Sequence, residues 1–341
     1  MFQFQEPFEI EACFEQIYQN SLGDQFSQEL INDTIISFQE FLNQNELVDR
    51  NTKVLLFGSI LNGFSTKKSD IDFTITTNSY ISEIKVLEYW ISQLKYQTRF
   101  QIQQNLLHAR TPVIKILDSQ NLIFIDLCYN NLLGAINTRL LKAYSQLDEK
   151  VKKGGILLKM WGKGAKIINN FLFSSYSIII LWLHFLQAKY QLPNLQDQKY
   201  NINKIESDLI IKRQLYQDEN VITIRTFFLH EDEVYEKVKY EFQKRISQIS
   251  LKTLFEEFFT YYSQDGYGFN QPYKISINQK ELKNQNIKYS MCDPFDPLHD
   301  PLLKINNAFK NNKAFSNAVF FLQNKWNVEY LFKEENEQLH Y

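Results

Sequence analysis

The sequence predicts an α/β domain followed by a mostly α domain, and three observations predict this fold class. Up to Asn137, short apolar runs rich in β-branched residues alternate with stretches of helical periodicity, as they do in an α/β unit. After Asn137 the apolar residues recur mainly at helical spacing. Ten Gly and seven Pro in 341 residues argue against a loop-dominated fold.

The elements of the first part follow from the period of the apolar residues. Helical periodicity predicts helices over 25–47 and 81–96. Four short runs rich in β-branched and aromatic residues predict strands, and these lie at 54–57, 70–77, 111–117 and 122–129. Together they predict a mixed sheet with helices.

In the second part, helical spacing predicts helices at 140–146, 148–162, 175–189, 234–247 and 251–262. The stretch 193–220 is polar and is expected to be a variable loop. Residues 270–332 are expected to mix short strands and helices.

Composition limits the class of protein and its partners. The net charge of −2 excludes a large basic surface, so any nucleic-acid contact must come from a local basic cleft. Three widely spaced cysteines show neither a metal-binding spacing nor a disulfide framework. The acidic N-terminus is unlike a signal peptide, and the apolar run 178–186 is too short to span a bilayer. We therefore expect an intracellular protein, cytoplasmic or nuclear, without a membrane partner.

Three carboxylates form the most informative pattern. Asp70 and Asp72 are two apart on a predicted strand, so both leave the same face. Such a pair repels itself unless a cation lies between the two groups, and hard oxygen ligands suit Mg²⁺. Asp126 lies inside an apolar strand and needs a compensating partner. If the two strands are neighbours, the three carboxylates can hold two Mg²⁺ ions, for which Mn²⁺ can substitute.

The turn Phe57-Gly58-Ser59 precedes the acid pair. Gly permits close approach of the backbone to a phosphate, and the Ser hydroxyl and nearby N–H groups can bind phosphate oxygens. A Gly-Ser turn by itself is more often structural, and an Asp-X-Asp pair is often a surface pair or a calcium site. The combination with Asp126 predicts catalysis of phosphoryl chemistry.

With these motifs the chain resembles the terminal uridylyltransferase and cytoplasmic poly(A) polymerase family of the polymerase-β nucleotidyltransferase superfamily, over roughly 26–332. The resemblance implies a two-lobed molecule with a cleft that holds the nucleotide. It implies a catalytic domain at 23–137. It also implies a helical poly(A)-polymerase-associated central domain that recognises the nucleotide, formed by 1–22 and 138–341.

The resemblance also implies nucleotide contacts along the chain. Asn131 and Thr138 match residues that contact the ribose, although Thr138 also suits a simple helix start. Lys159 and Lys163, four apart on one predicted helix face, match a pair that binds the β- and γ-phosphates. Without the resemblance, such a lysine pair would be an ordinary surface feature.

Two further segments complete the implied nucleotide site. Ser174 and Ser175 open a predicted helix, where Ser175 matches a phosphate contact or, on a structural interpretation, a helix cap. Tyr176 matches a residue that stacks on the base. In the loop 293–300, the family places Asp293 on the base edge and uses Asp296 to fix the loop or the histidine.

His299 carries the choice of nucleotide. UTP-preferring members tend to have a histidine at this position, where the imidazole can hydrogen-bond uracil and occupies space that a purine needs. A lone loop histidine would otherwise be an ordinary surface residue. Arg110 and Lys115 are candidates for the RNA backbone. Because no RNA-binding module is visible, a partner protein or complex is expected to supply RNA specificity.

The predicted function is template-independent addition of UMP from UTP to RNA 3′ ends, with release of pyrophosphate by two-metal catalysis. The 3′-hydroxyl would attack the α-phosphorus, with Asp126 helping its deprotonation. Relatives in this family act in RNA decay, surveillance and silencing. Three alternatives stay open: a poly(A) polymerase that uses ATP, an inactive RNA-binding subunit of a larger complex, and a transferase acting on a small molecule or a protein.

Overall fold

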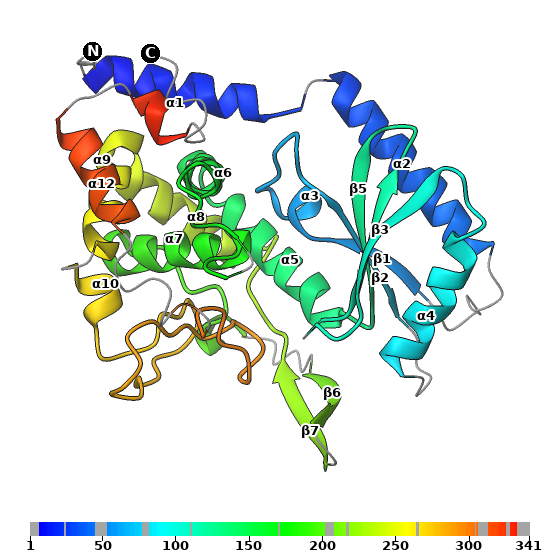
Figure 1. The fold of residues 1–341 in the computed structure, drawn as a ribbon. Coiled ribbons are helices and arrows are strands. Elements are labelled where there is room, and N and C mark those ends of the chain that lie inside the picture. Colours follow the sequence, from blue (N-terminus) through cyan, green and yellow to red (C-terminus); the bar gives the residue numbers. More distant parts are fainter. Residues whose placement is uncertain are drawn as a thin grey trace. The chain divides into compact units, whose positions relative to one another are not determined.

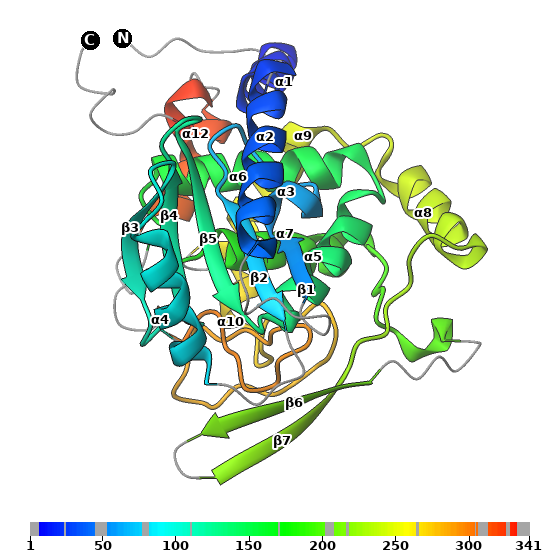
Figure 2. The same cartoon turned by 90° about the vertical axis from the view of Figure 1, so that its right-hand side faces the viewer.

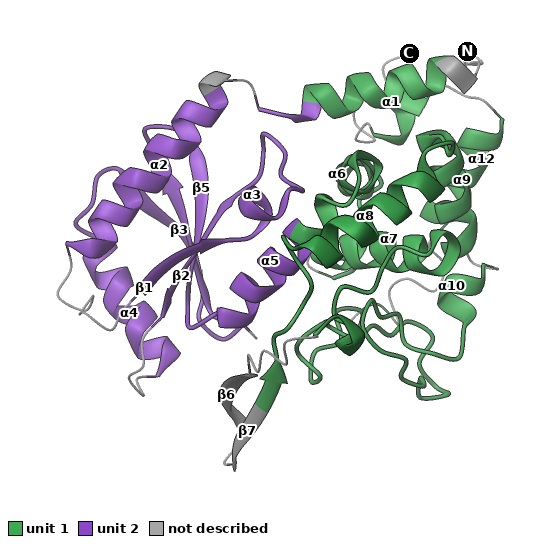
Figure 3. Cartoon of the chain, turned by 180° about the vertical axis from the view of Figure 1, so that it is seen from behind, with its two compact units in different colours: residues 1–20, 143–341 green, residues 21–142 purple. Residues whose placement is uncertain are grey.

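The computed structural model describes residues 7–23, 25–44, 53–76, 82–109, 111–169, 171–201, 208–215, 218–263, 266–303, 305, 313–324 and 328–332. The chain forms two compact units, shown in different colours in Figure 3. Unit 2 comprises Ser21–Lys142. Unit 1 is built from two separate segments, Met1–Asn20 and Ala143–Tyr341.

Unit 2 contains a five-stranded mixed sheet with the strand order β1-β2-β5-β4-β3 (Figures 1 and 2). Strands β2 and β5 are parallel, and the other neighbouring pairs are antiparallel. The elements, in chain order, are α2 (Gln25–Asn43), β1 (Lys53–Phe57), α3 (Ser59–Asn62), β2 (Ile71–Thr76), α4 (Glu83–Leu94), β3 (Phe100–Leu106), β4 (Val113–Asp118) and β5 (Ile123–Tyr129).

The core of unit 2 lies on one face of this sheet, where α2 and α4 cover it (Figure 1). Because side chains alternate along a strand, every second residue of β2, β4 and β5 points to this face, and these residues are mainly apolar. They include Ile71, Phe73, Ile114, Ile125 and Leu127, which pack against Phe38 of α2 and Trp90 of α4. The opposite face carries the residues between them, among which are the acids of the candidate site.

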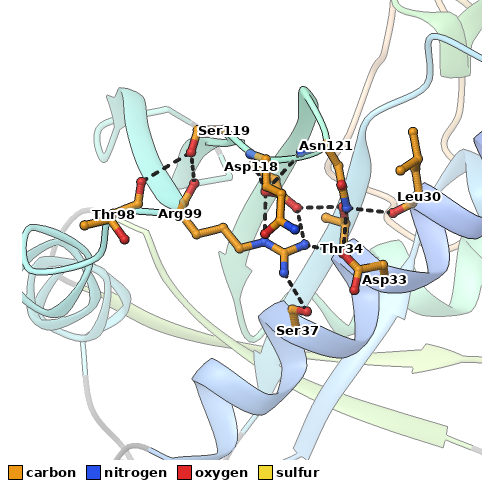
Figure 4. A network of polar contacts seen from close by, with 10 residues as sticks. Leu30, Asp33, Thr34, Ser37, Thr98, Arg99, Asp118, Ser119 and Asn121 are labelled. Carbon is orange, nitrogen blue, oxygen red and sulfur yellow. Dashed lines mark hydrogen bonds and ion pairs between the residues drawn. The ribbon is translucent and has the colours of Figure 1, made fainter.

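An ionic network around the buried Asp118 joins α2 to the core face of the sheet (Figure 4). Asp118, at the end of β4, is fully buried and accepts two hydrogen bonds from Arg99, of 3.0 and 2.8 Å. It also accepts a bond of 2.7 Å from Thr34 of α2, while Arg99 reaches Asp33 and Ser37 on the same helix. Burial raises the pKa of Asp118, but these hydrogen bonds outweigh it and hold the pKa below its usual value.

Unit 1 is mainly helical. Its elements are α1 (Pro7–Ser21), the end of α5 (Leu132–Ser145), α6 (Glu149–Gly164), α7 (Ser175–Tyr190), η1 (Gln198–Tyr200), β6 (Asp208–Leu215), β7 (Asp218–Arg225), α8 (Glu233–Ile246), α9 (Leu251–Tyr262), α10 (Tyr267–Asn270), α12 (Ala314–Gln323) and η2 (Val328–Leu331). At the α6–α7 contact, Gly154 faces Trp182 so closely that an added Cβ would lie 2.3 Å from the indole ring. This contact explains a glycine inside α6.

Several boundaries differ from the sequence prediction. Strand β3 was not predicted, because the segment Phe100–Leu106 has four exposed residues and a bulge in place of a clean apolar alternation. The expected loop at 193–220 contains η1 and part of the hairpin β6–β7. In 270–332 the described residues form isolated bridges but no regular strand. The predicted ends at 45–47, 77 and 81 lie outside the described residues.

Among the helices that the structure describes, none combines the length and the apolar character that crossing a bilayer requires.

Candidate active site

Two carboxylates stand side by side on the polar face of the unit 2 sheet. Asp72 of β2 and Asp126 of β5 are partners in the register of the parallel pair, so their side chains are neighbours on one face. Asp70 is exposed and lies one residue before β2, which begins at Ile71 and not at Asp70 as the sequence suggested. Among the described residues, no three His, Cys, Asp or Glu side chains form a group that could hold a metal ion.

Cys128 adds evidence that the acids cluster. It follows Asp126 on the same face of β5 and is buried. Burial, and then the charges of Asp72 and Asp126, raise the pKa of its thiol to about 12. Cys128 is therefore a protonated thiol at neutral pH, which leaves oxygen ligands as the donors of this face.

Lys115 of β4 pairs directly with Asp126. The two residues are opposite each other in the antiparallel register, and Nζ lies 2.9 and 2.7 Å from the two carboxylate oxygens. Burial lowers the pKa of Lys115, but the hydrogen bonds to Asp126 and the charges of Asp126, Asp70 and Asp72 outweigh it, so the pKa is raised. The structure thus places Lys115 at the carboxylates, where the sequence suggested an RNA contact. Arg110 lies outside the described residues.

The glycine turn meets the acid pair at the end of β1. Phe57 is the register partner of Asp72, and Gly58 follows it with a φ of +81°, a conformation that L side chains rarely adopt. A Cβ on Gly58 would lie 1.8 Å from Oδ2 of Asp72. Glycine is therefore required here for both its backbone conformation and its lack of a side chain. Ser59 is the first residue of α3.

Thr138 holds this turn from α5. The N–H of Gly58 donates to Oγ1 of Thr138 at 2.8 Å, and the same hydroxyl donates to the carbonyl of Gly134 at 2.8 Å. Thr138 is buried and lies in the second turn of α5, so the interpretation of Thr138 as a helix start is wrong. One lone pair of its hydroxyl is left for a ligand.

Asn131 caps the same helix. Its side-chain oxygen accepts from the N–H of Gly134 at 3.0 Å, which is the N-cap geometry for a helix that begins at Leu132. Its own N–H donates to the hydroxyl of Thr74 on β2 at 2.9 Å. Helix α5 therefore starts beside the carboxylate strands, because Asn131 and Thr138 both connect it to that end of the sheet.

The two lysines of α6 differ in environment. Lys159 is buried and Lys163, in the last turn, is exposed. Trp161, between the two lysines, is 2% exposed and packs against Phe259. The chain then turns from α6 to α7 through a loop in which the N–H of Phe173 donates to the carbonyl of Ile167 at 3.0 Å.

Ser174 is the N-cap of α7. Its hydroxyl accepts from the N–H of Ser177 at 3.0 Å, and the hydroxyl of Ser177 accepts from the N–H of Ser174, which completes a capping box. The structural interpretation of Ser175 as the cap is wrong. Ser175 is the first residue of α7, at a helix N-terminus that favours anions.

Asp293 connects α7 to the loop at 293–300. One oxygen, Oδ2, receives the hydroxyl of Tyr176 at 3.1 Å and lies 3.1 Å from Nδ1 of His299. The other oxygen accepts the N–H groups of Phe295 and Asp296. Burial raises the pKa of Asp293, but the hydrogen bonds from His299 and these N–H groups outweigh it, so the pKa is lowered. Asp293 is therefore ionised at neutral pH.

Asp296 stabilises the loop by a different route. Its carboxylate accepts from the N–H of Leu298 at 3.1 Å, and its carbonyl accepts from the N–H of His299 at 3.0 Å. Of the two acids, Asp293 contacts the imidazole and Asp296 shapes the backbone that carries it. The His299 side chain is 31% exposed.

Sequence reasoning missed two features of this site. The first is the Lys115–Asp126 pair, although a lysine between Ile114 and Ile116 on a predicted strand could have indicated a polar partner on the opposite face. The second is Gly134, where an added Cβ would lie 2.9 Å from Phe57 and 2.7 Å from Asn131. Nothing in the sequence around Gly134 marks it as a contact between α5 and β1.

The mixed sheet, with two acids on adjacent parallel strands beside a glycine turn, has the fold of the polymerase-β-like nucleotidyltransferases. Solved structures agree. The Cid1 poly(U) polymerase bound to MgGTP has a TM-score of 0.74 at 20% identity, covering 96% of this chain and 99% of that one. A cytoplasmic RNA terminal U-transferase has a TM-score of 0.73 at 21% identity, covering 96% and 98%.

The sequence comparisons find similar proteins of one group. Residues 10–146 match the family model of the central palm domain of mitochondrial-like poly(A) RNA polymerase. Caffeine-induced protein 16 of Schizosaccharomyces pombe is 32% identical over 266 residues, which cover 76% of this chain and 20% of that protein. Poly(A) RNA polymerase gld-2 of Caenorhabditis elegans is 35% identical over 162 residues, covering 44% and 14%. The chain thus spans about a fifth or less of the length of these relatives.

In residues 10–146 and in its fold the chain is therefore similar to the terminal nucleotidyltransferases, the group that contains these poly(U) and poly(A) polymerases.

Proposed function

We propose that this protein is a template-independent RNA nucleotidyltransferase that adds UMP from UTP to RNA 3′ ends and releases pyrophosphate. The observation that carries the proposal is the register pair of Asp72 and Asp126 on adjacent parallel strands, with the Gly58 turn packed against Asp72. Two neighbouring carboxylates on a polar sheet face repel each other, and their hard oxygen atoms suit a divalent cation.

The donors of unit 2 fit Mg²⁺ or Mn²⁺. Asp72 and Asp126 supply hard oxygen ligands, and we assign Asp70, beside the start of β2, as the third carboxylate. When bound, divalent cations neutralise the triphosphate charge and polarise the attacking hydroxyl. The Gly58 turn and the hydroxyl of Ser59 would bind phosphate oxygens.

The reaction needs one residue of the protein to accept the proton of the RNA 3′-hydroxyl. The RNA 3′-oxygen bonds to the α-phosphorus, the bond to the β-phosphate oxygen breaks, and pyrophosphate leaves. Asp126 accepts the hydroxyl proton and passes it to solvent. Asn131 and Thr138 hold the start of α5 beside this strand end, where each could also contact the ribose.

In unit 1 we assign the triphosphate to Lys163, Lys159 and Ser175, and the base to Tyr176 and the loop at 293–300. The N-terminal end of α7 and the exposed ammonium of Lys163 both favour phosphate. Asp293 accepts from the hydroxyl of Tyr176, so it fixes the ring that would stack on the base.

The preference for UTP rests on His299. Because ionised Asp293 receives Nδ1–H, the other ring nitrogen, Nε2, is the one available to the base. Relatives named as poly(A) polymerases favour the alternative, ATP. The solved relatives with high structural similarity include a poly(U) polymerase, which supports UTP.

A four-nucleotide extension assay tests the proposal. Purified protein is given an oligoribonucleotide, Mg²⁺ or Mn²⁺, and each triphosphate separately. We expect UTP to be incorporated most efficiently and Asp72→Asn to abolish extension. Asp232→Asn is the matched control, because Asn retains the N-cap of α8 that Asp232 provides.

Each alternative has its own outcome in this assay. Dominant ATP incorporation would identify a poly(A) polymerase. Equal background incorporation by the parent and by Asp72→Asn, with retained RNA binding, would identify an inactive RNA-binding subunit. Consumption of triphosphate without RNA extension would indicate a small-molecule or protein substrate. With a net charge of −2, we expect RNA affinity to be modest and a partner protein to supply RNA choice.

A further inference from the structure

A row of three charged residues crosses the polar face of the unit 2 sheet. Lys115 on β4 faces Asp126 on β5, and Asp126 faces Asp72 on β2, each through the strand register. The row therefore contains one cation and two acids on three neighbouring strands. Asp70 and Asp72 both lie close enough to Lys115 for their charges to act on its ammonium group.

The contact between Lys115 and Asp126 uses both carboxylate oxygens. Nζ lies 2.9 Å from Oδ1 and 2.7 Å from Oδ2, so it occupies the position between the oxygens where a bidentate cation would bind. The Lys115 side chain is 35% exposed and the Asp126 side chain 19%. A partly exposed ammonium on a flexible stem can turn toward solvent without disturbing the sheet.

From this geometry we infer that Lys115 is a resident counter-cation of the carboxylate cluster, which holds Asp126 in the metal-free protein and competes with the divalent ion for it. Metal binding exchanges the ammonium for the ion on the Asp126 oxygens. The inference rests on the proposed function, because it takes Asp126 as a metal ligand. Lys115 is a positioning residue and not a catalytic one.

The sign of one measurement separates competition from orientation. If Lys115 merely orients Asp126 for the metal, its removal weakens metal binding. If it competes, its removal tightens metal binding, since a positive charge beside the ion is lost and both oxygens become available. Lys115 therefore lowers the affinity of the site for the divalent ion when no nucleotide is bound. The negative charges of the triphosphate then favour binding of the ion.

The test measures Mn²⁺ binding to protein without nucleotide or RNA, by the electron paramagnetic resonance signal of free Mn²⁺. For Lys115→Gln we expect the dissociation constant to fall on the order of tenfold, and the melting temperature without metal to fall. Lys115→Arg, which keeps the charge and the paired donors, should stay near the parent. Lys53→Gln, at the exposed start of β1, is the matched control.

The outcomes separate the inference from the proposed function. Unchanged or weaker Mn²⁺ binding in Lys115→Gln would overturn the inference while the function stands, provided Asp72→Asn abolishes binding. If the parent and Asp72→Asn bind Mn²⁺ equally poorly, the proposed metal site itself fails. Should Lys115→Gln not fold, Lys115→Met, expressed and purified with Mn²⁺, gives the same comparison. Loss of RNA binding with unchanged Mn²⁺ affinity would instead indicate that Lys115 contacts the RNA backbone.

Discussion

Replacement of Gly58 by alanine is the sharpest test of how the turn serves the acid pair. A Cβ at this position would lie 1.8 Å from Oδ2 of Asp72, and real Cβ atoms essentially never approach within 3.0 Å. The two groups must therefore separate by about 1.2 Å or more, the difference between these two distances. A displacement of about 1 Å at a reacting group can cost roughly 100-fold in rate.

The same change strains the backbone. Gly58 has φ +81° and ψ −157°, a region essentially restricted to glycine, where another residue costs about 1–3 kcal/mol. For a unit of this size we expect the melting temperature to fall by roughly 5–10 °C. We therefore expect Gly58→Ala to fold, to melt earlier, and to lose about 100-fold in kcat for UTP incorporation.

The control separates strain from displacement. Gly63, at the C-terminal end of α3, has a φ of +86°, so Gly63→Ala strains the same segment by about 1–2 kcal/mol. We expect it to melt earlier but to keep kcat within about threefold of the parent. Equal kcat losses in the two variants, or a Gly58→Ala enzyme with parental kcat, would refute the argument that Gly58 is required for the position of Asp72.

Three further predictions concern other parts of the molecule. Asp118→Asn should cost about 3–5 kcal/mol of unfolding free energy at pH 7. Because the folded pKa of Asp118 is below its usual value of 3.8, the part of this difference that depends on the ionised carboxylate should be lost as pH falls through the folded pKa, which urea titrations at pH 7 and pH 3 would show. Asp293→Asn should lower the ratio of kcat/KM for UTP to kcat/KM for ATP by about tenfold, because the His299 imidazole is no longer held in one orientation. An unchanged ratio would exclude the role of Asp293 in orienting His299. Ser174→Ala should lower the free energy of unfolding by about 1 kcal/mol, because the helix cap is lost, with little change in KM. Ser175→Ala should raise the KM for UTP with little change in stability. The opposite pattern would mean that Ser175 is the cap and Ser174 the phosphate contact.

Alternation along strands was enough to predict the polar face of the sheet. With Ile71 and Phe73 buried, Asp72 had to lie on the other side, and the same argument applies to Asp126 between Ile125 and Leu127. That their strands are direct neighbours in register was not available from periodicity, because strand pairing is a long-range property. The sequence could therefore predict Asp72 and Asp126 as site residues, but not that the two side chains are neighbours.

Where prediction failed, local signals conflicted with tertiary contacts. Helix α5 begins at Leu132, although Gly134 in its first turn disfavours a helix, because Asn131 caps it and Gly134 allows close contact with Phe57. Ser174 and Ser175 are equally good caps by residue type, and the Ser177 hydroxyl decides between them. The partner of Lys115 depended on the β4–β5 register.

The discontinuous build of unit 1 affects how the chain folds as it is synthesised. Helix α1 packs through Phe14 on Phe255, pairs Glu15 with Lys153, and receives the Lys252 N–H at Glu11. Ser21 and Leu251 are 230 positions apart in the sequence, so α1 leaves the ribosome roughly 10–50 s before α9 is made. Unit 2 can complete its sheet in that interval, while the apolar side of α1 stays exposed until α9 has been synthesised.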